Sequence, residues 1–154
     1  MAICHCTECQ RRTGSVFGVS AHFPKEQVRI EGPSKAYVRA SGSGRKVEFH
    51  FCPDCGDSVF WYAEVRPAHI RIASGTFADP LMPWPTVSIW ETTRHPWVTF
   101  DHLVDRFTRF EPFGLGKQLY RSVRISSSPT SSSSSRARRP DYRYSEMDSV
   151  RANH

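Results

Sequence analysis

Five cysteines are the residues of this sequence best suited to carry chemistry, and they fall into two clusters. The first cluster runs from Cys4 to Cys9 and the second contains Cys52 and Cys55. An odd number of cysteines without a visible secretion signal argues against a disulfide framework and indicates reduced thiols in the cytoplasm. Thiolates at such short spacings are ligands for a soft divalent metal, above all zinc.

The two clusters favour different kinds of metal site. Cys4, Cys6 and Cys9 form a Cys-x-Cys-x-x-Cys run that can bring three thiolates to one face of a loop and leave one coordination position open, as in catalytic zinc sites. Cys52 and Cys55 form a Cys-x-x-Cys-Gly knuckle at a strand end. The residues alone leave two alternatives open: one structural zinc site that takes two thiols from each cluster, or a redox pair in the second cluster. A redox pair is disfavoured because no βαβ pattern surrounds it.

The elements that must position these thiols are mainly short β-strands. Aromatic and β-branched stretches bounded by turn residues predict strands over 16–23, 28–31, 36–39, 47–51, 58–63, 69–73 and 86–90. The stretch 47–51 and the triplet 70–72 alternate apolar and polar residues, as a strand with one solvent-exposed face does. A short helix is predicted after Thr7, which can cap it, ending at Gly14, and a second near 101–106. Trp84, Trp90 and Trp97 are expected in the core.

Charge and composition separate a body from a tail. The formal net charge is +6, and residues 114–154 carry eight Lys and Arg against three Asp and Glu. Residues 126–135 contain eight serines, one proline and one threonine, a composition that buries too little apolar area to become ordered. We therefore expect one domain over 1–113 and a disordered Ser/Arg-rich tail over 114–154. No apolar run suits a membrane span, and contact with nucleic acid is expected only through the basic tail.

Both cysteine clusters resemble signatures of one known family. Residues 4–14 resemble the Cys-x-Cys-x-x-Cys-(Arg/Gln)-(Arg/Lys)-x-(Ser/Thr)-Gly signature of the glutathione-dependent formaldehyde-activating enzymes, a family that also includes centromere-protein-V-like proteins. Residues 51–56 resemble its second signature, Phe-Cys-x-x-Cys-Gly. Segments 73–77 and 89–98 look like later parts of the family pattern, so the likeness covers about 3–112.

This resemblance implies a β-tent fold, in which small antiparallel sheets with short helical insertions are organised around zinc. It also implies that Cys4, Cys6 and Cys9 bind a catalytic zinc, while Cys52 and Cys55 supply half of a structural zinc site. In the family pattern an upstream Cys-x-Cys pair completes the structural site. Because that pair would precede Cys4, we expect the chain to be truncated relative to the family and the second site to be incomplete.

The activity implied by the resemblance is the condensation of glutathione with formaldehyde to S-(hydroxymethyl)glutathione, a carbon–sulfur lyase reaction. Zinc can lower the pKa of a bound thiol or polarise an aldehyde oxygen, and three cysteinate ligands weaken the second effect. Arg11 and Arg12 follow the first cluster and are expected either to hold a glutathione carboxylate or to be solvated surface cations. The alternatives are a zinc-stabilised binding module without catalysis and an inactive fragment.

Overall fold

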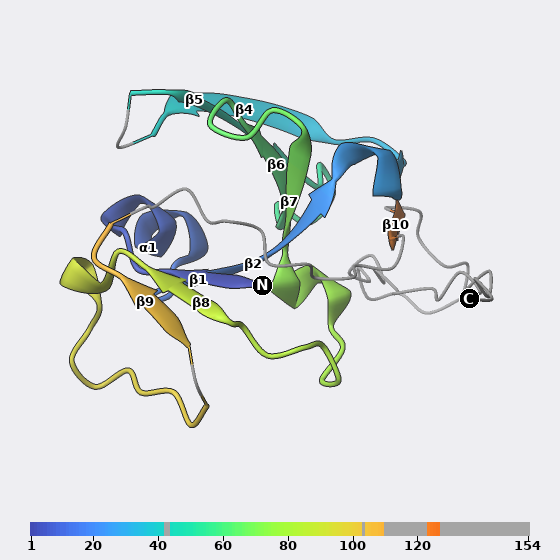
Figure 1. Cartoon of the computed structure of the whole chain (residues 1–154). Coiled ribbons are helices and arrows are strands. Elements are labelled where there is room, and N and C mark those ends of the chain that lie inside the picture. The colour runs from blue at the N-terminus through green and yellow to red at the C-terminus, as the bar shows by residue number, and fades with distance from the viewer. Residues whose placement is uncertain (42–43, 103, 110–122, 127–154) are drawn as a thin grey trace, which may run out of the picture.

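The structure, a computed structural model, describes residues 1–41, 44–102, 104–109 and 123–126, and most of its elements are strands (Figure 1). The helical elements are α1 (Thr7–Thr13) and the 3-10 turns η1 (Lys25–Gln27), η2 (Ser74–Phe77) and η3 (Glu91–Thr93). The predicted mainly-β class is confirmed. The strands are β1 (Ala2–Cys4), β2 (Gly18–Pro24), β3 (Val28–Glu31), β4 (Lys35–Ala40), β5 (Lys46–Phe51), β6 (Ser58–Ala63), β7 (His69–Ala73), β8 (Val87–Ile89), β9 (Asp105–Phe107) and β10 (Val123–Ser126).

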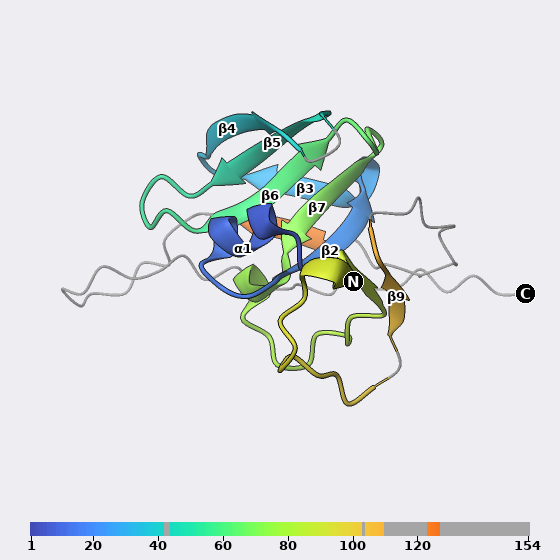
Figure 2. The same cartoon turned by 90° about the vertical axis from the view of Figure 1, so that its left-hand side faces the viewer.

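Eight of the strands form one bent sheet. Its order is β4-β5-β6-β7-β2-β1-β8-β9, and β10 pairs with β3 in a second sheet of two strands. The half made by β4 to β7 faces the half made by β2, β1, β8 and β9, and α1 lies at one open end between them (Figure 1). Seen from that end, α1 lies in front of the sheet (Figure 2). A bent sheet of this kind has a concave face, which α1 partly closes.

The strand pairing is mixed rather than wholly antiparallel. The pairs from β4 to β1 are antiparallel, as expected, whereas β1–β8, β8–β9 and β10–β3 are parallel. Parallel neighbours need long crossover connections, and here long segments separate the paired strands in the sequence. The expectation of small antiparallel sheets therefore has to be corrected to one large mixed sheet and one small parallel pair.

Alternation along the strands separates the core from the concave face. On β7, Ile70 and Ile72 are buried in a core cluster that also contains Phe23 and Phe60, while Arg71 points to the opposite face. Arg71 lies opposite His22 of β2 in the antiparallel register. Because side chains alternate across a strand, the same strands that bury the aliphatic core also present polar groups to the concave face.

Several sequence predictions about elements are confirmed, and one is wrong. Strands 28–31, 58–63 and 69–73 match at both ends, and the helix that begins near Thr7 ends at the C-cap Gly14. The helix predicted near 101–106 does not form, because Asp105–Phe107 pairs in parallel with β8 instead. A helix so short has little stability of its own, so pairing with a neighbouring strand decides the structure.

The predicted tail lies mostly outside the described residues. Residues 110–122 and 127–154 are not described, so the domain boundary and the disorder of these parts stay predictions. Val123–Ser126 differs from the expectation, since it forms β10 beside β3. The Val-Arg-Ile triplet in this strand has the alternation and β-branching that favour a strand.

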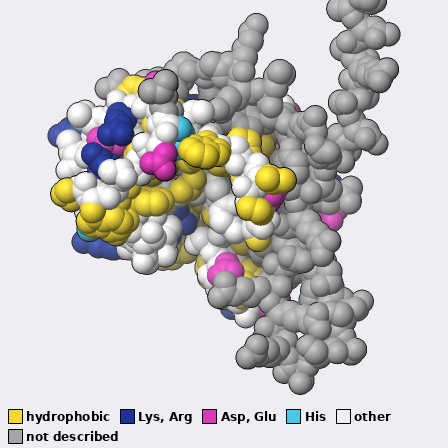
Figure 3. All heavy atoms as spheres, turned by 90° about the horizontal axis from the view of Figure 1, so that it is seen from below, with side chains coloured by type: hydrophobic (Ala, Val, Ile, Leu, Met, Phe, Trp, Pro, Cys, Tyr) yellow, Lys and Arg dark blue, Asp and Glu magenta, His cyan; other side chains and the backbone are white. Residues whose placement is uncertain are grey.

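Two of the three tryptophans expected in the core are on the surface. Trp84 and Trp97 are 62% and 68% exposed, whereas Trp90 is half-buried. Hydrophobic side chains are visible on the face of the molecule seen from below (Figure 3). Trp84 packs edge-on against His102, with ring centroids 4.5 Å apart. Within the described part of the chain, no helix has the length and apolar character needed to cross a membrane.

Candidate metal centre and its cavity

Three cysteines converge where β1 leads into α1. Cys4 is the last residue of β1, Cys6 is the N-cap of α1 and Cys9 lies in the first turn of the helix. Their sulfur atoms all lie within 4.8 Å of one another. β1 lies between β2 and β8, with Cys4 opposite Gly18 and Ile89. The sheet therefore holds one thiol while the helix holds the other two.

The local geometry of α1 explains why Cys6 and Cys9 face the same point. Cys6 has an extended backbone, and its sulfur accepts a hydrogen bond from the backbone N–H of Cys9 at 3.4 Å. Thr7, which we predicted as the cap, is the first helical residue instead. At the other end Gly14 adopts a φ of 66°, a left-handed conformation that favours glycine, and its N–H donates to the carbonyl of Gln10.

The clustered thiols stabilise negative charge on one of their sulfurs. Hydrogen bonds from the thiols of Cys4 and Cys9 and from the backbone N–H groups of Cys9 and Glu8 lower the pKa of Cys6 to about 2, although burial opposes this shift. The pKa of Cys4 is raised because hydrogen bonds to Cys6 and Cys9, together with burial, favour its protonated form. Thiolate is the form of cysteine that binds metals.

The donor set fits zinc. Two sulfurs bound to one tetrahedral zinc at ~2.3 Å lie roughly 3.8 Å apart, so sulfurs that already lie within 4.8 Å of one another need only small shifts. All three cysteines are half-buried, so the cluster is open to a ligand. Three protein sulfurs leave a fourth tetrahedral position for a substrate, as in catalytic zinc sites.

Hydrogen bonds tie the cysteine loop to η3. The Gln10 amide donates to the carbonyls of His5 at 2.7 Å and Thr93 at 3.1 Å. The Thr93 hydroxyl donates to the same His5 carbonyl at 2.9 Å. The His5 ring is fully buried, with Nε2 3.2 Å from the hydroxyl of Ser88. His5 therefore serves the loop as a structural residue, and its neighbours hold the thiols in place.

The thiols open into a cavity of about 700 Å³ between the two halves of the sheet and α1. Its lining combines residues from both halves of the sheet with residues of α1. The lining residues are Ala2, Cys4, Cys6, Thr7, Glu8, Cys9, Ser20, His22, Arg39, Ser41, Arg45, Lys46, Val47, Phe49, Trp61, Ala63, Val65, Arg71, Ile89, Trp90, Thr93 and Arg109. Among the described residues of this lining, cations outnumber carboxylates, since Glu8 is the only acidic one of them. The cavity therefore suits an anionic ligand.

Arg71 is a cavity-lining cation whose charge interacts with two of the thiols. Burial lowers its pKa, and the negative charges of Cys4 and Cys9 act in the opposite direction. In the sheet it lies between Trp61 of β6 and His22 of β2. A guanidinium remains charged at neutral pH, so Arg71 brings a fixed positive charge to the floor of the cavity.

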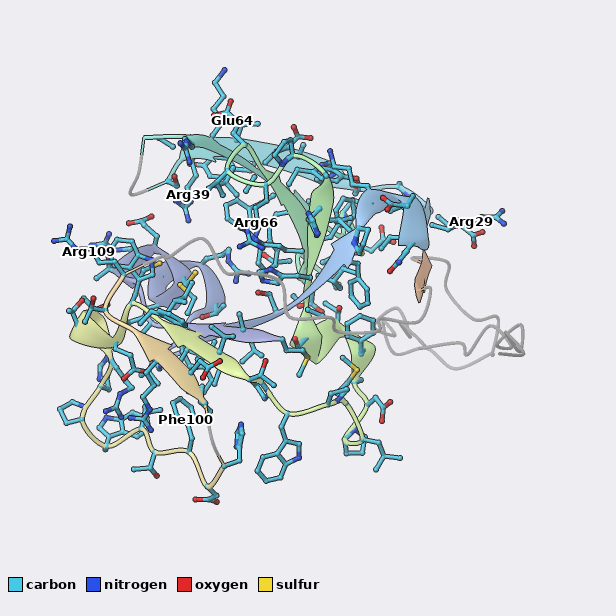
Figure 4. All side chains as sticks on the ribbon, viewed as in Figure 1. Arg29, Arg39, Glu64, Arg66, Phe100 and Arg109 are labelled. Atoms are coloured by element: carbon cyan, nitrogen blue, oxygen red, sulfur yellow. The ribbon has the colours of Figure 1, made fainter. Side chains whose placement is uncertain are left out.

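The other cations come from the β4–β5 hairpin and from the segment that follows β9. Arg39 of β4 points from the upper half of the sheet toward α1, and Arg109 lies on the α1 side of the molecule (Figure 4). Arg45 and Lys46 follow the turn between β4 and β5. All four line the cavity. We call Arg39, Arg45, Lys46 and Arg109 the cationic rim.

The two arginines singled out from the sequence do not line this cavity. Arg11 is exposed and pairs with Glu8 at 2.7 Å. The Arg12 guanidinium lies over the rings of Trp61 and Phe49, 4.6 Å and 5.4 Å from their centroids. A Cβ on Gly18 would approach the Arg12 side chain to 3.0 Å, so glycine there allows α1 to lie close to β2. Arg12 thus joins α1 to the sheet.

The second cysteine cluster lies away from the first. Cys52 is buried in the aliphatic core, Cys55 is exposed, and their side chains share a hydrogen bond. The backbone forms the expected tight turn, with the N–H of Gly56 donating to the carbonyl of Cys52 at 2.9 Å. Among the described residues, only Cys4, Cys6 and Cys9 form a group of three or more side chains that could share an ion. The zinc role of Cys52 and Cys55 stays a prediction.

Sequence reasoning missed Arg71 and the cationic rim as site residues. For Arg71 a signal was present, because the alternation over 70–72 places it on the face opposite the two isoleucines. The rim residues carry no local signal, since they belong to segments that meet only in the folded chain.

These observations define a class: a mainly-β protein in which three thiols that could hold a metal ion lie in a cationic cavity. Residues 1–93 match the model of the family described as glutathione-dependent formaldehyde-activating enzyme. The match covers both cysteine clusters and more than half of the chain, so the chain belongs to this family. A search of curated proteins finds no match.

Proposed function

We propose that the protein is a zinc-dependent carbon–sulfur lyase that interconverts glutathione plus a small aldehyde, formaldehyde in the family reaction, and the S-hydroxyalkyl adduct. The convergence of the Cys4, Cys6 and Cys9 sulfurs at the floor of a cavity carries this proposal. Family membership supports the substrate pair. We place the reaction in the cytoplasm, where five free cysteines stay reduced.

Cys4, Cys6 and Cys9 would hold the zinc, which would lower the pKa of the glutathione thiol when bound. The residues of the chain orient the substrate around that point. Arg71 offsets negative charge beside Cys4 and Cys9. The cationic rim suits the glutathione carboxylates, since arginine and lysine form charge-assisted hydrogen bonds with carboxylates. Arg11 and Arg12, which lie outside the cavity lining, are weaker candidates for that contact than the rim.

The reaction is a balanced addition. The glutathione sulfur forms a bond to the aldehyde carbon, the carbon–oxygen double bond becomes a single bond, and the proton lost by the thiol ends on the new hydroxyl. No oxidant or reductant is needed. Residues that position the thiol against the aldehyde contribute by lowering the entropy cost of bringing the two together.

The test uses the zinc-loaded full chain and NMR exchange spectroscopy of formaldehyde, glutathione and their adduct. We expect the wild type to speed the exchange, and Cys6→Ser to lose the enhancement while its far-UV circular dichroism is unchanged. Cys55→Ser is the matched control, because Cys55 is exposed and lies outside the cavity lining, and it should keep the enhancement. Zinc binding without any enhancement in the wild type would refute the lyase and favour the binding-module alternative.

A further inference from the structure

One wall of the cavity is apolar. Val47 and Phe49 of β5 lie opposite Ala63 and Trp61 of β6 in the antiparallel register, so the four side chains form a block on one face of the sheet. All four are buried and all line the cavity. The Phe49 and Trp61 rings are in contact, with centroids 5.6 Å apart. We call these four residues the apolar wall.

The apolar wall lies close to the reacting centre. Trp61 is directly opposite Arg71 in the sheet, and both residues line the same cavity as the three thiols. Neighbouring strands are about 4.8 Å apart. The wall therefore begins on the strand next to Arg71 and faces the same cavity as the three thiols, where a substituent on the carbon bonded to the substrate sulfur can reach it.

Formaldehyde does not use this wall. Its adduct adds only a hydroxymethyl group to the sulfur, and the single methylene of this group is too small to cover the four side chains. The carboxylates of a peptide thiol are suited to the cationic rim rather than to an apolar surface. The Arg12 and Arg39 guanidinium groups lie over the Phe49 ring, and Arg12 also lies over the Trp61 ring, but all four wall residues still line the cavity. The part of the substrate that can contact their cavity-facing side is the aldehyde-derived carbon and what it carries.

We infer that the cavity accepts the adduct of an anionic thiol with an aldehyde larger than formaldehyde, whose apolar substituent packs against Val47, Phe49, Trp61 and Ala63. This inference rests on the proposed function and narrows its substrate class. The reaction is the same addition, in which the thiol sulfur bonds to the aldehyde carbon and the proton passes to the oxygen. Each buried methylene adds about fourfold to affinity.

Stable thioethers test the inference without turnover. S-methylglutathione and S-butylglutathione differ by three methylenes and carry the same charges. Isothermal titration of the zinc-loaded full chain should show that the butyl compound binds at least tenfold more tightly. Equal binding, or weaker binding of the butyl compound, would overturn the inference.

Two substitutions in the apolar wall test whether the butyl group binds there. Val47→Thr keeps the shape of the side chain and adds a hydroxyl, and Ala63→Leu fills space in the cavity. Each should lower the butyl preference at least threefold and leave S-methylglutathione binding within twofold. Ala36→Leu is the matched control for Ala63→Leu, because Ala36 is an exposed residue of β4 outside the cavity lining, and it should keep the full preference.

The outcomes separate this inference from the proposed function. A butyl preference that both wall variants leave unchanged would show that the substituent binds elsewhere and would overturn the inference. If Ala63→Leu fails to fold by circular dichroism, the isosteric Val47→Thr still decides the question. If the protein speeds formaldehyde exchange but shows no preference for the butyl compound, the substrate inference is wrong and the proposed lyase activity stands. If it prefers the butyl compound but turns over no aldehyde adduct, the proposed lyase activity is wrong.

Discussion

Replacing Arg12 by glutamine tests whether this residue anchors α1, which carries two of the three proposed zinc ligands, or instead contacts the substrate. The guanidinium of Arg12 lies between α1 and the sheet, 4.6 Å from the centroid of Trp61 and 5.4 Å from that of Phe49. Arg11 is the matched control, since its side chain is 75% exposed and contacts Glu8 on the helix surface. Both variants remove one positive charge from adjacent positions.

The expected magnitudes differ because the surroundings differ. A guanidinium over an aromatic ring contributes ~0.5–1 kcal/mol at an exposed site and about 2 kcal/mol when desolvated. Two half-buried contacts therefore predict a loss of roughly 1–3 kcal/mol in the free energy of unfolding for Arg12→Gln. An exposed ion pair within a helix contributes at most about 0.5 kcal/mol, which sets the expectation for Arg11→Gln.

The Arg12→Gln substitution should also lower the affinity of the chain for zinc. α1 carries two of the three thiols, so a looser helix holds Cys6 and Cys9 less firmly. If 1.4 kcal/mol of helix anchoring is transmitted to the site, zinc affinity falls about tenfold. Urea unfolding of the zinc-loaded chain measures stability, and competition with a chelator measures affinity.

The comparison can fail in two ways. If Arg12→Gln and Arg11→Gln have the same small effect on unfolding, the contacts with Phe49 and Trp61 do not anchor α1. If Arg12→Gln instead weakens glutathione binding and leaves stability and zinc affinity unchanged, Arg12 contacts the substrate, as one interpretation of the sequence has it.

Two further predictions concern the metal and pH. Gently purified protein should hold close to one zinc per chain by elemental analysis, bound by Cys4, Cys6 and Cys9, and folded protein with no zinc would refute the metal centre. Burial and the nearby charge of Arg71 hold the pKa of His22 well below its usual value, so only the unfolded chain gains this proton as pH falls below about 6.5. The free energy of unfolding should therefore decrease between pH 7 and 5, and His22→Asn should make that pH dependence shallower; identical slopes in urea titrations would contradict this reasoning.

Local patterns were enough to predict much of the strand content and the first cysteine cluster. Strands such as 58–63 and 69–73 are recognisable because their residue types and turn boundaries are local properties. The spacing of Cys6 and Cys9 around a helix start is likewise local, because backbone geometry within one turn sets which side chains meet. The confirmed family follows from the same short motifs.

The tertiary structure alone decided which distant groups share the cavity. Arg71 shares the cavity with the thiols and the apolar wall, because the register of β7 with β6 and β2 places it between Trp61 and His22. Arg12 is a half-buried anchor and Arg11 an exposed cation, although the two are adjacent in the sequence, because only one of them faces the sheet. Asp105–Phe107 is a strand because β8 offers it a partner. Pairing between segments far apart depends on the whole folded chain, so short-range spacing carries no record of it.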